Sequence, residues 1–353
     1  MTDLTPWHTW REIHAQPQIW RDFATELEAE ADDLRRWIAT DADAVWLSGA
    51  GTSAYIGDFV AAALAANSER PLLSVPSTDL VSAPSQFPIG RGRPLLLSFG
   101  RSGNSAESVG ALNVMDALAP DAPRLNITCN KESALATRPA SNQRVVVLPD
   151  ACHDQGFAMT SSYTTMLLTA LTLLDPARPG DALPRLADAL EDALPAFQSL
   201  SESITTPDRV VVTGSGALRF AAREAALKIM ELSAGQIPAL WDSSLGFRHG
   251  PKSFVTPNTH VFCMVSSDPA IARYDRDLAA ELRQQFPGLS VTELAPPPIN
   301  DTWGGVIPVV AAQIFAVHLA SRLGLNVDDP FKGQGTLTRV VGDVKLYPPA
   351  GQA

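Results

Sequence analysis

From residue 44 onward the chain alternates short apolar runs with longer stretches of helical spacing. The short runs are apolar throughout rather than at every second position, which is typical of strands covered on both faces of a parallel sheet. We predict strands at residues 44–47, 72–75, 94–98, 125–128 and 145–148, and helices near 54–66, 106–118 and 164–174. This order predicts a doubly wound α/β unit.

The same alternation begins again after a polar, proline-containing stretch and a helix that ends near residue 203. The string VWLSGAG at 45–51 is echoed by VVVTGSG at 210–216, and an alanine-rich helix follows each. Predicted strands lie at 209–213, 237–240, 260–265, 290–294 and 306–310, with helices near 217–233, 270–286 and 309–323. The repetition indicates a tandem duplication, with a mainly parallel five-stranded sheet flanked by helices in each half.

Large apolar residues at helical spacing before the first strand predict an N-terminal helical arm. The tryptophans of this arm are expected to pack against a domain or a second subunit. We therefore divide the 353 residues into a helical arm (1–40), a first domain (41–195) and a second domain (196–353).

Composition limits the classes of partner. A net charge of −11 argues against nucleic acid, which requires a basic face. No apolar run is long and unbroken enough to predict a membrane span, and the first residues lack the pattern of a signal peptide. Three widely spaced cysteines fit neither a disulfide framework nor a zinc site. A cytoplasmic protein is expected.

Two loops of small and hydroxylated residues, 48–53 and 98–105, each follow a predicted strand and open a predicted helix. Small residues let the backbone approach an anion, hydroxyl groups donate to its oxygens, and a helix N-terminus adds free N–H groups. The two loops predict a cradle for one phosphate group, formed by Gly51, Thr52, Ser53, Arg101, Ser102, Gly103, Asn104 and Ser105.

The second half has diverged at the position of the second loop. It carries Asp268 and Pro269 there, and a carboxylate would repel a phosphate while proline removes a backbone donor. One phosphate site per chain is therefore expected, in the first half.

A dinucleotide site is an alternative, because Gly49, Gly51 and Ala54 match the spacing of the dinucleotide fingerprint. That fingerprint also needs an acidic residue at the end of the second strand, and Asp79 comes too late in the chain to supply it. The phosphate interpretation is preferred.

Glu224, Lys228 and Glu231 share one face of the predicted helix 217–233. They could form an ordinary solvated stripe, since Glu followed four residues later by Lys is a common surface pair. The other residues of this helix are mostly apolar, which favours a buried helix. Buried carboxylates beside a lysine have altered proton affinities suited to acid–base chemistry.

His249 follows a predicted strand within a polar loop, with Arg248 before it and Gly250 and Pro251 after it. A single histidine in a loop is most often unremarkable. These neighbours nevertheless favour a fixed imidazole, which makes His249 a candidate acid–base residue.

Several motifs together resemble the sugar isomerase (SIS) domain proteins over nearly the whole chain. Within that family the similarity is to the galactosamine-6-phosphate deaminase/isomerase group, also called tagatose-6-phosphate ketose/aldose isomerases. The motifs are WREI..QP at 10–17, SGNS.ES at 102–108, AMTSS at 158–162, AREAALK at 222–228 and LGFRHGP at 245–251.

The resemblance implies a role for each candidate residue. It places Thr52, Ser53, Arg101, Ser102 and Ser105 at the phosphate, and it adds Thr160 and Ser161 as substrate-binding candidates. It makes Glu231 the carboxylate that moves a proton between C1 and C2, with Glu224 and Lys228 as its companions on the helix. It makes His249 the ring-opening residue, lent by a neighbouring subunit in a homodimer.

The related glucosamine-6-phosphate synthase takes ammonia from an attached glutaminase domain, whereas this chain reaches its first SIS-like strand by residue 44. Release of ammonia from an amino sugar phosphate is therefore the expected net reaction, with galactosamine 6-phosphate as substrate and tagatose 6-phosphate as product. No metal or other cofactor is expected. The alternatives are a glucosamine-6-phosphate deaminase, a plain aldose/ketose phosphate isomerase, and a sugar phosphate sensor without catalytic activity.

Overall fold

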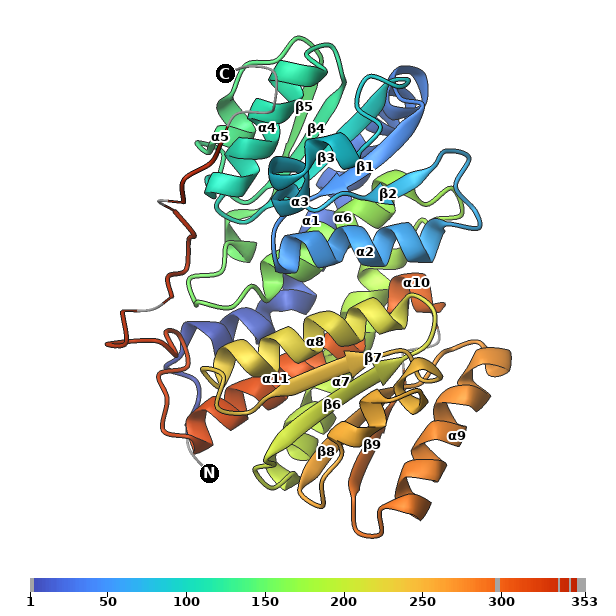
Figure 1. Ribbon diagram of the computed structural model, residues 1–353, viewed down its shortest axis with the longest axis vertical. Helices are drawn as coiled ribbons and strands as arrows, with labels where there is room; N and C mark the ends of the chain where they lie inside the picture. The colour runs from blue at the N-terminus through green and yellow to red at the C-terminus, as the bar shows by residue number, and fades with distance from the viewer. Residues whose placement is uncertain (1–2, 296–298, 336, 343, 348–353) are drawn as a thin grey trace. The chain divides into compact units, whose positions relative to one another are not determined.

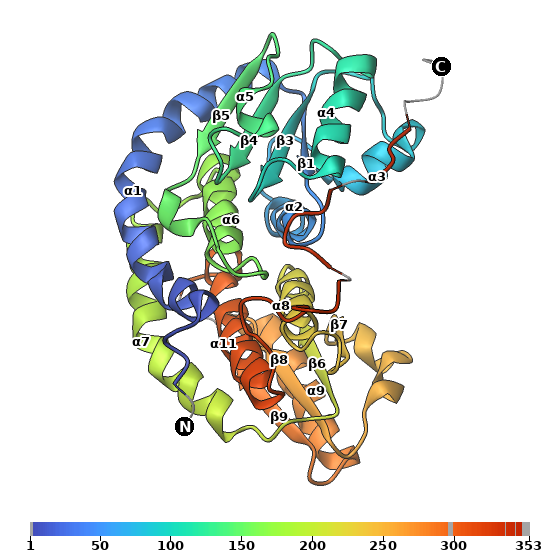
Figure 2. The same cartoon turned by 90° about the vertical axis from the view of Figure 1, so that its left-hand side faces the viewer.

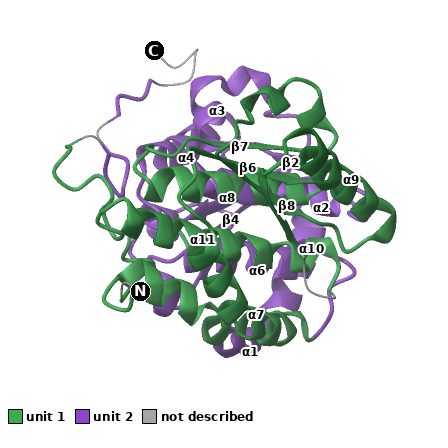
Figure 3. Cartoon of the chain, turned by 90° about the horizontal axis from the view of Figure 1, so that it is seen from below, with its two compact units in different colours: residues 1–20, 154–160, 181–336 green, residues 21–153, 161–180, 337–353 purple. Residues whose placement is uncertain are grey.

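The computed structural model describes residues 3–295, 299–335, 337–342 and 344–347. The chain divides into two compact units, and each is assembled from several stretches of sequence (Figure 3). Unit 1 comprises residues 1–20, 154–160 and 181–336, and unit 2 comprises residues 21–153, 161–180 and 337–353. Each unit contains one parallel sheet flanked by helices (Figures 1 and 2).

The sheet of unit 2 has five parallel strands in the order β2-β1-β3-β4-β5. Every residue of β3 and β4 is buried, as expected for central strands covered on both faces. The strands are β1 (Ala44–Ser48), β2 (Leu72–Ser74), β3 (Pro94–Gly100), β4 (Arg124–Thr128) and β5 (Gln143–Val147). All five strands predicted for the first half are therefore confirmed, with small shifts at their ends.

Helices cover both faces of this sheet. On one face, Trp46 and Leu96 pack with Leu112 and Met115 in a buried apolar cluster. On the other face α2 packs along β1 and β2 and against α6. The helices of unit 2 are α2 (Thr52–Leu64), α3 (Ser77–Ser82), α4 (Ala106–Leu118), α5 (Ala134–Thr137) and α6 (Ser161–Leu174), with the 3-10 turns η1 (Pro84–Gln86) and η2 (Asp150–Cys152).

The sheet of unit 1 is also parallel, in the order β7-β6-β8-β9. Its strands are β6 (Arg209–Gly214), β7 (Ala239–Asp242), β8 (Thr259–Met264) and β9 (Ser290–Leu294). Its helices are α7 (Ala182–Ser203), α8 (Leu218–Leu232), α9 (Pro269–Gln285), α10 (Asp301–Gly304) and α11 (Val306–Arg322), with η3 (Gly246–Arg248) and η4 (Pro251–Phe254). Figure 1 shows α8 and α11 on one side of the sheet and α9 on the other.

The prediction of a strand at 306–310 is wrong, because these residues form the start of α11. Within the described part of unit 1 the sheet therefore has four strands instead of the predicted five. A short apolar run does not distinguish a buried strand from a buried helix, and Pro308 is tolerated in the first turn of a helix. The stretch Asp301–Arg322 is apolar and long enough to cross a membrane, but 94% of its most apolar window is buried inside the protein, as in a core helix.

The predicted N-terminal arm is one long helix, α1 (His8–Asp41), which continues through Pro17. Residues 8–20 belong to unit 1 and residues 21–41 to unit 2. Proline at position 17 removes the N–H that would bond to the carbonyl oxygen of Ile13. The side-chain amide of Gln16 donates to that oxygen instead, at 3.0 Å, so the helix is not interrupted.

Candidate active site

The two predicted phosphate-binding loops lie next to each other in unit 2. They follow β1 and β3, which are hydrogen-bonded neighbours with Ser48 opposite Ser98. From β1 the chain moves to one edge of the sheet, and from β3 it moves to the other. This is a topological switch point, and ligands of open α/β sheets bind outside the carboxyl ends of the strands there.

In the first loop the backbone turns sharply at Gly51, which has a φ of 56°. A Cβ atom on Gly49 would lie 2.6 Å from the backbone of Ser53, so glycine is required for the loop to pass this close to α2. Helix α2 begins at Thr52 without a side-chain cap. Thr52 and Ser53 are buried in the first turn, where the N–H of Ser53 donates to the backbone oxygen of Ala50 at 3.1 Å and that of Ala54 to Gly51 at 2.9 Å.

The second loop is held by its own side chains. The Asn104 side chain accepts a hydrogen bond from the backbone N–H of Ala134 at 2.8 Å, and Ser105 caps α4 by accepting from the N–H of Ser108. Gly103 has a φ of 63°. Ser102 accepts through its backbone oxygen from the Asn130 side chain at 3.2 Å.

Arg101 is buried, and its guanidinium donates to the backbone oxygen of Arg339 at 2.8 Å. The N–H of Ala106 donates to the oxygen of Val341 at 3.4 Å. Part of the C-terminal segment therefore lies against the second loop, within unit 2.

The candidates Thr160 and Ser161 are both buried and donate to protein acceptors. Thr160 donates through its N–H and its hydroxyl to the buried carboxylate of Asp154, at 2.9 and 2.8 Å. The hydroxyl of Ser161 donates to the backbone oxygen of Cys152 at 3.4 Å. Thr160 belongs to unit 1, and Ser161 begins α6 in unit 2.

The three charged residues of α8 lie together, as their spacing predicts. The ammonium group of Lys228 is 3.3 Å from Glu224 and 2.6 Å from Glu231. The side chains of Glu224 and Lys228 are fully buried, whereas the Glu231 side chain is 24% exposed. Of the three residues, only Glu231 can be reached from outside the unit.

The charges on this face of α8 are coupled. Burial opposes the positive charge of Lys228, but the two carboxylates outweigh it and raise the pKa of Lys228 above its ordinary value. The lysine therefore stays protonated at neutral pH and stabilises negative charge on both glutamates. A carboxylate that is paired with an ammonium yet partly exposed can exchange a proton with a bound molecule.

His249 follows η3 in unit 1, and its side chain is exposed. Its backbone N–H donates to Gly246 at 2.9 Å. The flanking cations Arg248 and Lys252 both pair with Glu281 of α9, at 2.7 and 2.6 Å. Sequence reasoning missed Glu281, since pairing between a loop and a later helix leaves no local pattern.

The switch point of the second sheet differs from that of the first because it is filled by the protein's own carboxylate. The buried side chain of Asp275 accepts from the Ser215 hydroxyl at 2.6 Å, from the Ser244 hydroxyl and from the N–H of Ser266 at 3.0 Å. Asp268 caps α9 by accepting from the N–H of Ala270, and Pro269 follows it. A side chain of α9 thus takes up the donors at this switch point.

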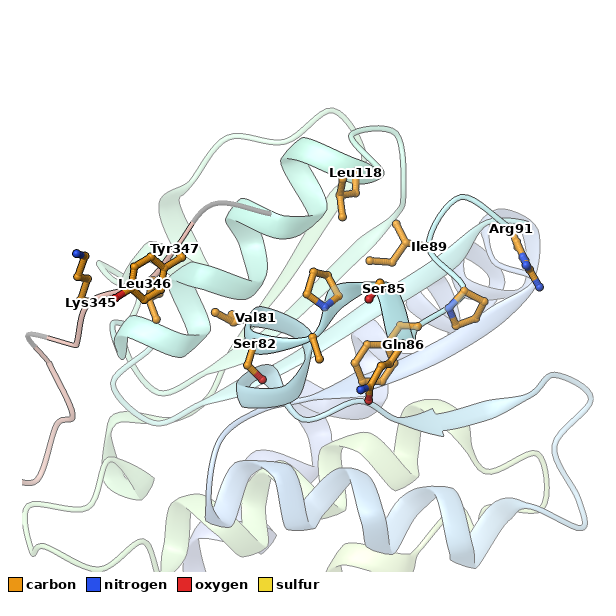
Figure 4. Close-up of a pocket in the computed structure, with 14 residues that line it drawn as sticks. Val81, Ser82, Ser85, Gln86, Ile89, Arg91, Leu118, Lys345, Leu346 and Tyr347 are labelled. Atoms are coloured by element: carbon orange, nitrogen blue, oxygen red, sulfur yellow. The ribbon is translucent and has the colours of Figure 1, made fainter. Parts of the chain in front are cut away.

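A surface pocket of about 1010 Å³ lies elsewhere in unit 2 (Figure 4). Residues 81–89, Arg91, Leu118 and residues 345–347 line it, and none of these is a candidate site residue. The candidates therefore form two groups, with the phosphate loops in unit 2 and the α8 cluster and His249 in unit 1.

Comparison with known proteins gives a consistent set of relatives. The SIS domain family matches residues 39–175. The D-galactosamine-6-phosphate deaminase of Shewanella sp. (strain ANA-3) is 37% identical over 365 residues, which cover 99% of this chain and 94% of that protein. The enzyme of the same name from Escherichia coli is 37% identical over 370 residues. The match covers 96% of this chain and 96% of that protein.

A solved structure is similar over the same length. The crystal structure of tagatose-6-phosphate ketose/aldose isomerase from Escherichia coli matches with a TM-score of 0.89 and 34% sequence identity. The match covers 100% of this chain and 99% of that one.

Proposed function

Because the chain belongs to the SIS domain family, we propose that it is an amino sugar phosphate deaminase that converts D-galactosamine 6-phosphate to D-tagatose 6-phosphate and ammonia. The observation that carries this proposal is the cluster on α8, where a buried lysine links a buried glutamate to a partly exposed one. The substrate is inferred from the names of the relatives. The cluster contains Glu231, a group that is able to move the proton.

The phosphate group binds at the switch point of the first sheet. The hydroxyls of Thr52, Ser53 and Ser102 donate to its oxygens, and Arg101 supplies positive charge. His249 moves a proton between O5 and O1 and so opens the pyranose ring.

Glu231 then takes the proton from C2 of the open-chain amino aldose and returns it to C1. As the C2 proton leaves, O1 takes up a proton and an enolamine forms. Return of the proton to C1 then gives a protonated ketimine at C2. Water adds to the ketimine carbon, the C–N bond breaks, and ketose 6-phosphate and ammonia leave. Lys228 stabilises the negative charge that Glu231 carries before the first transfer and again after the second, and Glu224 keeps Lys228 protonated.

The reacting assembly is a cytoplasmic homodimer in which His249 comes from the second copy. Two exposed apolar side chains in unit 1 support an interface there: Leu245 in the His249 loop is 46% exposed, and Met230 beside Glu231 is 41% exposed. Large exposed apolar groups are typical of surfaces that a partner covers.

The two halves of the chain arose by tandem duplication of one SIS domain. Both sheets share the order second, first, third and fourth strand. Gly51 and Gly216 have φ values of 56° and 57° at the same point after the first strand of each sheet. A Cβ on Gly49 would meet Ser53, and one on Gly214 would meet Leu218, four residues on in each case.

A plain aldose/ketose isomerase is the second candidate, because the similar crystal structure carries that name. The same groups would move the same proton in a sugar without an amine, and no ammonia would form. A gluco configuration at C4 is the remaining alternative for the substrate.

One assay decides between these functions. The purified enzyme is incubated separately with galactosamine 6-phosphate, glucosamine 6-phosphate and tagatose 6-phosphate, and released ammonia and ketose are measured. Ammonia from galactosamine 6-phosphate supports the proposal, whereas interconversion of sugars without ammonia establishes the plain isomerase.

The role of Glu231 is tested in the same assay with Glu231→Gln. We expect ammonia release to fall by about 10²-fold or more, because general acid–base groups supply 10²–10⁴-fold. Binding of the substrate, measured by calorimetry, should remain within about 3-fold, since the amide keeps the size of the side chain. A variant that retains more than about a tenth of the native turnover would remove Glu231 from this role.

A further inference from the structure

The loop that carries His249 is attached to a single helix. Four residues of α9 lie on one face of that helix, because they follow one another at spacings of three, three and one. They are Asp275, Leu278, Glu281 and Leu282. Each of them contacts the segment 244–252 or the apolar cluster in which that segment is anchored.

The start of the loop is fixed by burial. The hydroxyl of Ser244, fully buried, donates to the carboxylate of Asp275. Phe247 is also fully buried, in a cluster that contains Leu278 and Leu282. Two of the six residues from Ser244 to His249 are therefore held against α9 by side chains that solvent does not reach.

The end of the loop is fixed by charge. Glu281 pairs through one oxygen with Arg248, which immediately precedes His249, and through the other with Lys252, which follows it by three residues. The hydrogen bond from Lys252, with the charge of both cations, lowers the pKa of the Glu281 carboxyl. Both ion pairs therefore persist at neutral pH, one on each side of an exposed imidazole.

We propose that Glu281 is a positioning residue, which holds the imidazole of His249 in place for ring opening by binding Arg248 and Lys252 at the same time. Asp275 sets the start of the same loop through Ser244. This inference rests on the proposed role of His249 as the ring-opening group.

The physical reason is the sensitivity of proton transfer to geometry. An exposed side chain on a loop samples many positions, and a displacement of about 1 Å can cost about 10²-fold in rate. A single exposed ion pair stabilises little, but two that share one carboxylate fix both sides of a short loop at once.

The test compares Glu281→Ala with Arg283→Ala. Arg283 lies on the same helix and forms a surface ion pair of the same length, 2.6 Å, with Glu293, away from the His249 loop. Removing it controls for loss of an ion pair on α9. Hydrogen exchange of the backbone amides of residues 243–254 is measured by mass spectrometry, together with kcat and KM for ammonia release.

We expect Glu281→Ala to speed exchange in 243–254 and to lower kcat by about 10-fold with little change in KM, because substrate is still bound but the imidazole is misplaced. Glu281→Gln, which keeps an acceptor but loses the charge, should fall between Glu281→Ala and the native protein. Arg283→Ala should change neither quantity. In a His249→Ala background, Glu281→Ala should cause no additional loss, since coupled residues are not additive.

Unchanged exchange in Glu281→Ala would overturn the anchoring, and additive losses with His249→Ala would overturn the action through His249. If the proposed function is wrong, the native protein releases no ammonia. The hydrogen-exchange comparison would still decide whether Glu281 holds the loop.

Discussion

At the scale of single residues, burial separates the three charged side chains of α8. Glu224 and Lys228 are fully buried, whereas the Glu231 side chain is 24% exposed. The two carboxylates raise the pKa of Lys228 against the opposing effect of burial, so the lysine stays protonated at neutral pH. Glu231 is therefore the member of the cluster that a bound sugar can reach.

A half-buried carboxylate on α1 gives a prediction about pH. Burial, followed by the nearby charge of Asp154, raises the pKa of Glu12 to about 7 although backbone N–H groups of Gln155 and Gly156 donate to it. Between pH 4.5 and 7 the folded protein keeps a proton that the unfolded chain releases, so stability falls as pH rises through this range.

Glu12→Gln removes this titration. Relative to the native protein, the variant should gain about 1–2 kcal/mol in free energy of unfolding between pH 5 and pH 8, after allowance for the partial exposure of the site. Urea unfolding at both pH values measures the difference. Glu30→Gln, at an exposed position of the same helix, serves as the control. Parallel pH profiles for native protein and Glu12→Gln would contradict the prediction.

Local spacing made part of the candidate site predictable. Glu224, Lys228 and Glu231 follow the helical repeat, so their shared face could be inferred before their contacts were known. The partners of the His249 loop, Asp275 and Glu281, could not be inferred in this way. Their contacts join segments about 30 residues apart through a fold that the sequence does not display locally.

At the scale of elements, the loop between a strand and the next helix determines where an anion binds. Gly51 and Gly216 occupy corresponding loops with nearly equal φ values, and a Cβ on either would meet open space. Alanine at either position therefore costs only backbone strain, roughly 1–3 kcal/mol. Only the loop of Gly51 belongs to the predicted phosphate cradle.

Gly51→Ala should therefore weaken binding of inorganic phosphate by about 10-fold or more, because the strained residue displaces the hydroxyls of Thr52 and Ser53 that follow it. Gly216→Ala should leave the phosphate affinity unchanged. It should lower the melting temperature by about as much as Gly51→Ala does. Calorimetric titration with phosphate and thermal unfolding of both variants provide the comparison. Equal weakening in the two variants would place the anion outside the first-half loop.

Helices and strands could be predicted from the sequence where the apolar pattern and the length of the run indicated the same element. The run at 94–98 is short, apolar and followed by a glycine-containing loop, and it forms the fully buried β3. The run at 306–310 has the same character but is the start of fifteen consecutive buried residues in α11. Length is what separates a buried helix from a buried strand, and an apolar start alone does not reveal it.

At the scale of the whole molecule, the candidate residues are distributed over two compact units. The phosphate loops lie in unit 2, whereas Glu231 and His249 lie in unit 1. If His249 acts in the site of the second copy, Glu231 of one chain works with the imidazole of the other. Each active site of a symmetric dimer then requires both chains.

This arrangement predicts complementation between two severely impaired variants. Glu231→Gln and His249→Ala are each expected to keep only a small residual activity as homodimers. In a mixed dimer, one site combines the intact Glu231 of one chain with the intact His249 of the other, and the second site lacks both. Random pairing makes half of the dimers mixed, so co-expression should restore about a quarter of the native ammonia release. Two purified variants mixed without subunit exchange should restore none, and the double variant co-expressed with itself provides the baseline.

If His249 instead serves its own chain, every mixed dimer keeps one defect in each site. Co-expression would then give no more activity than the separate variants, which would assign the complete acid–base set to a single chain.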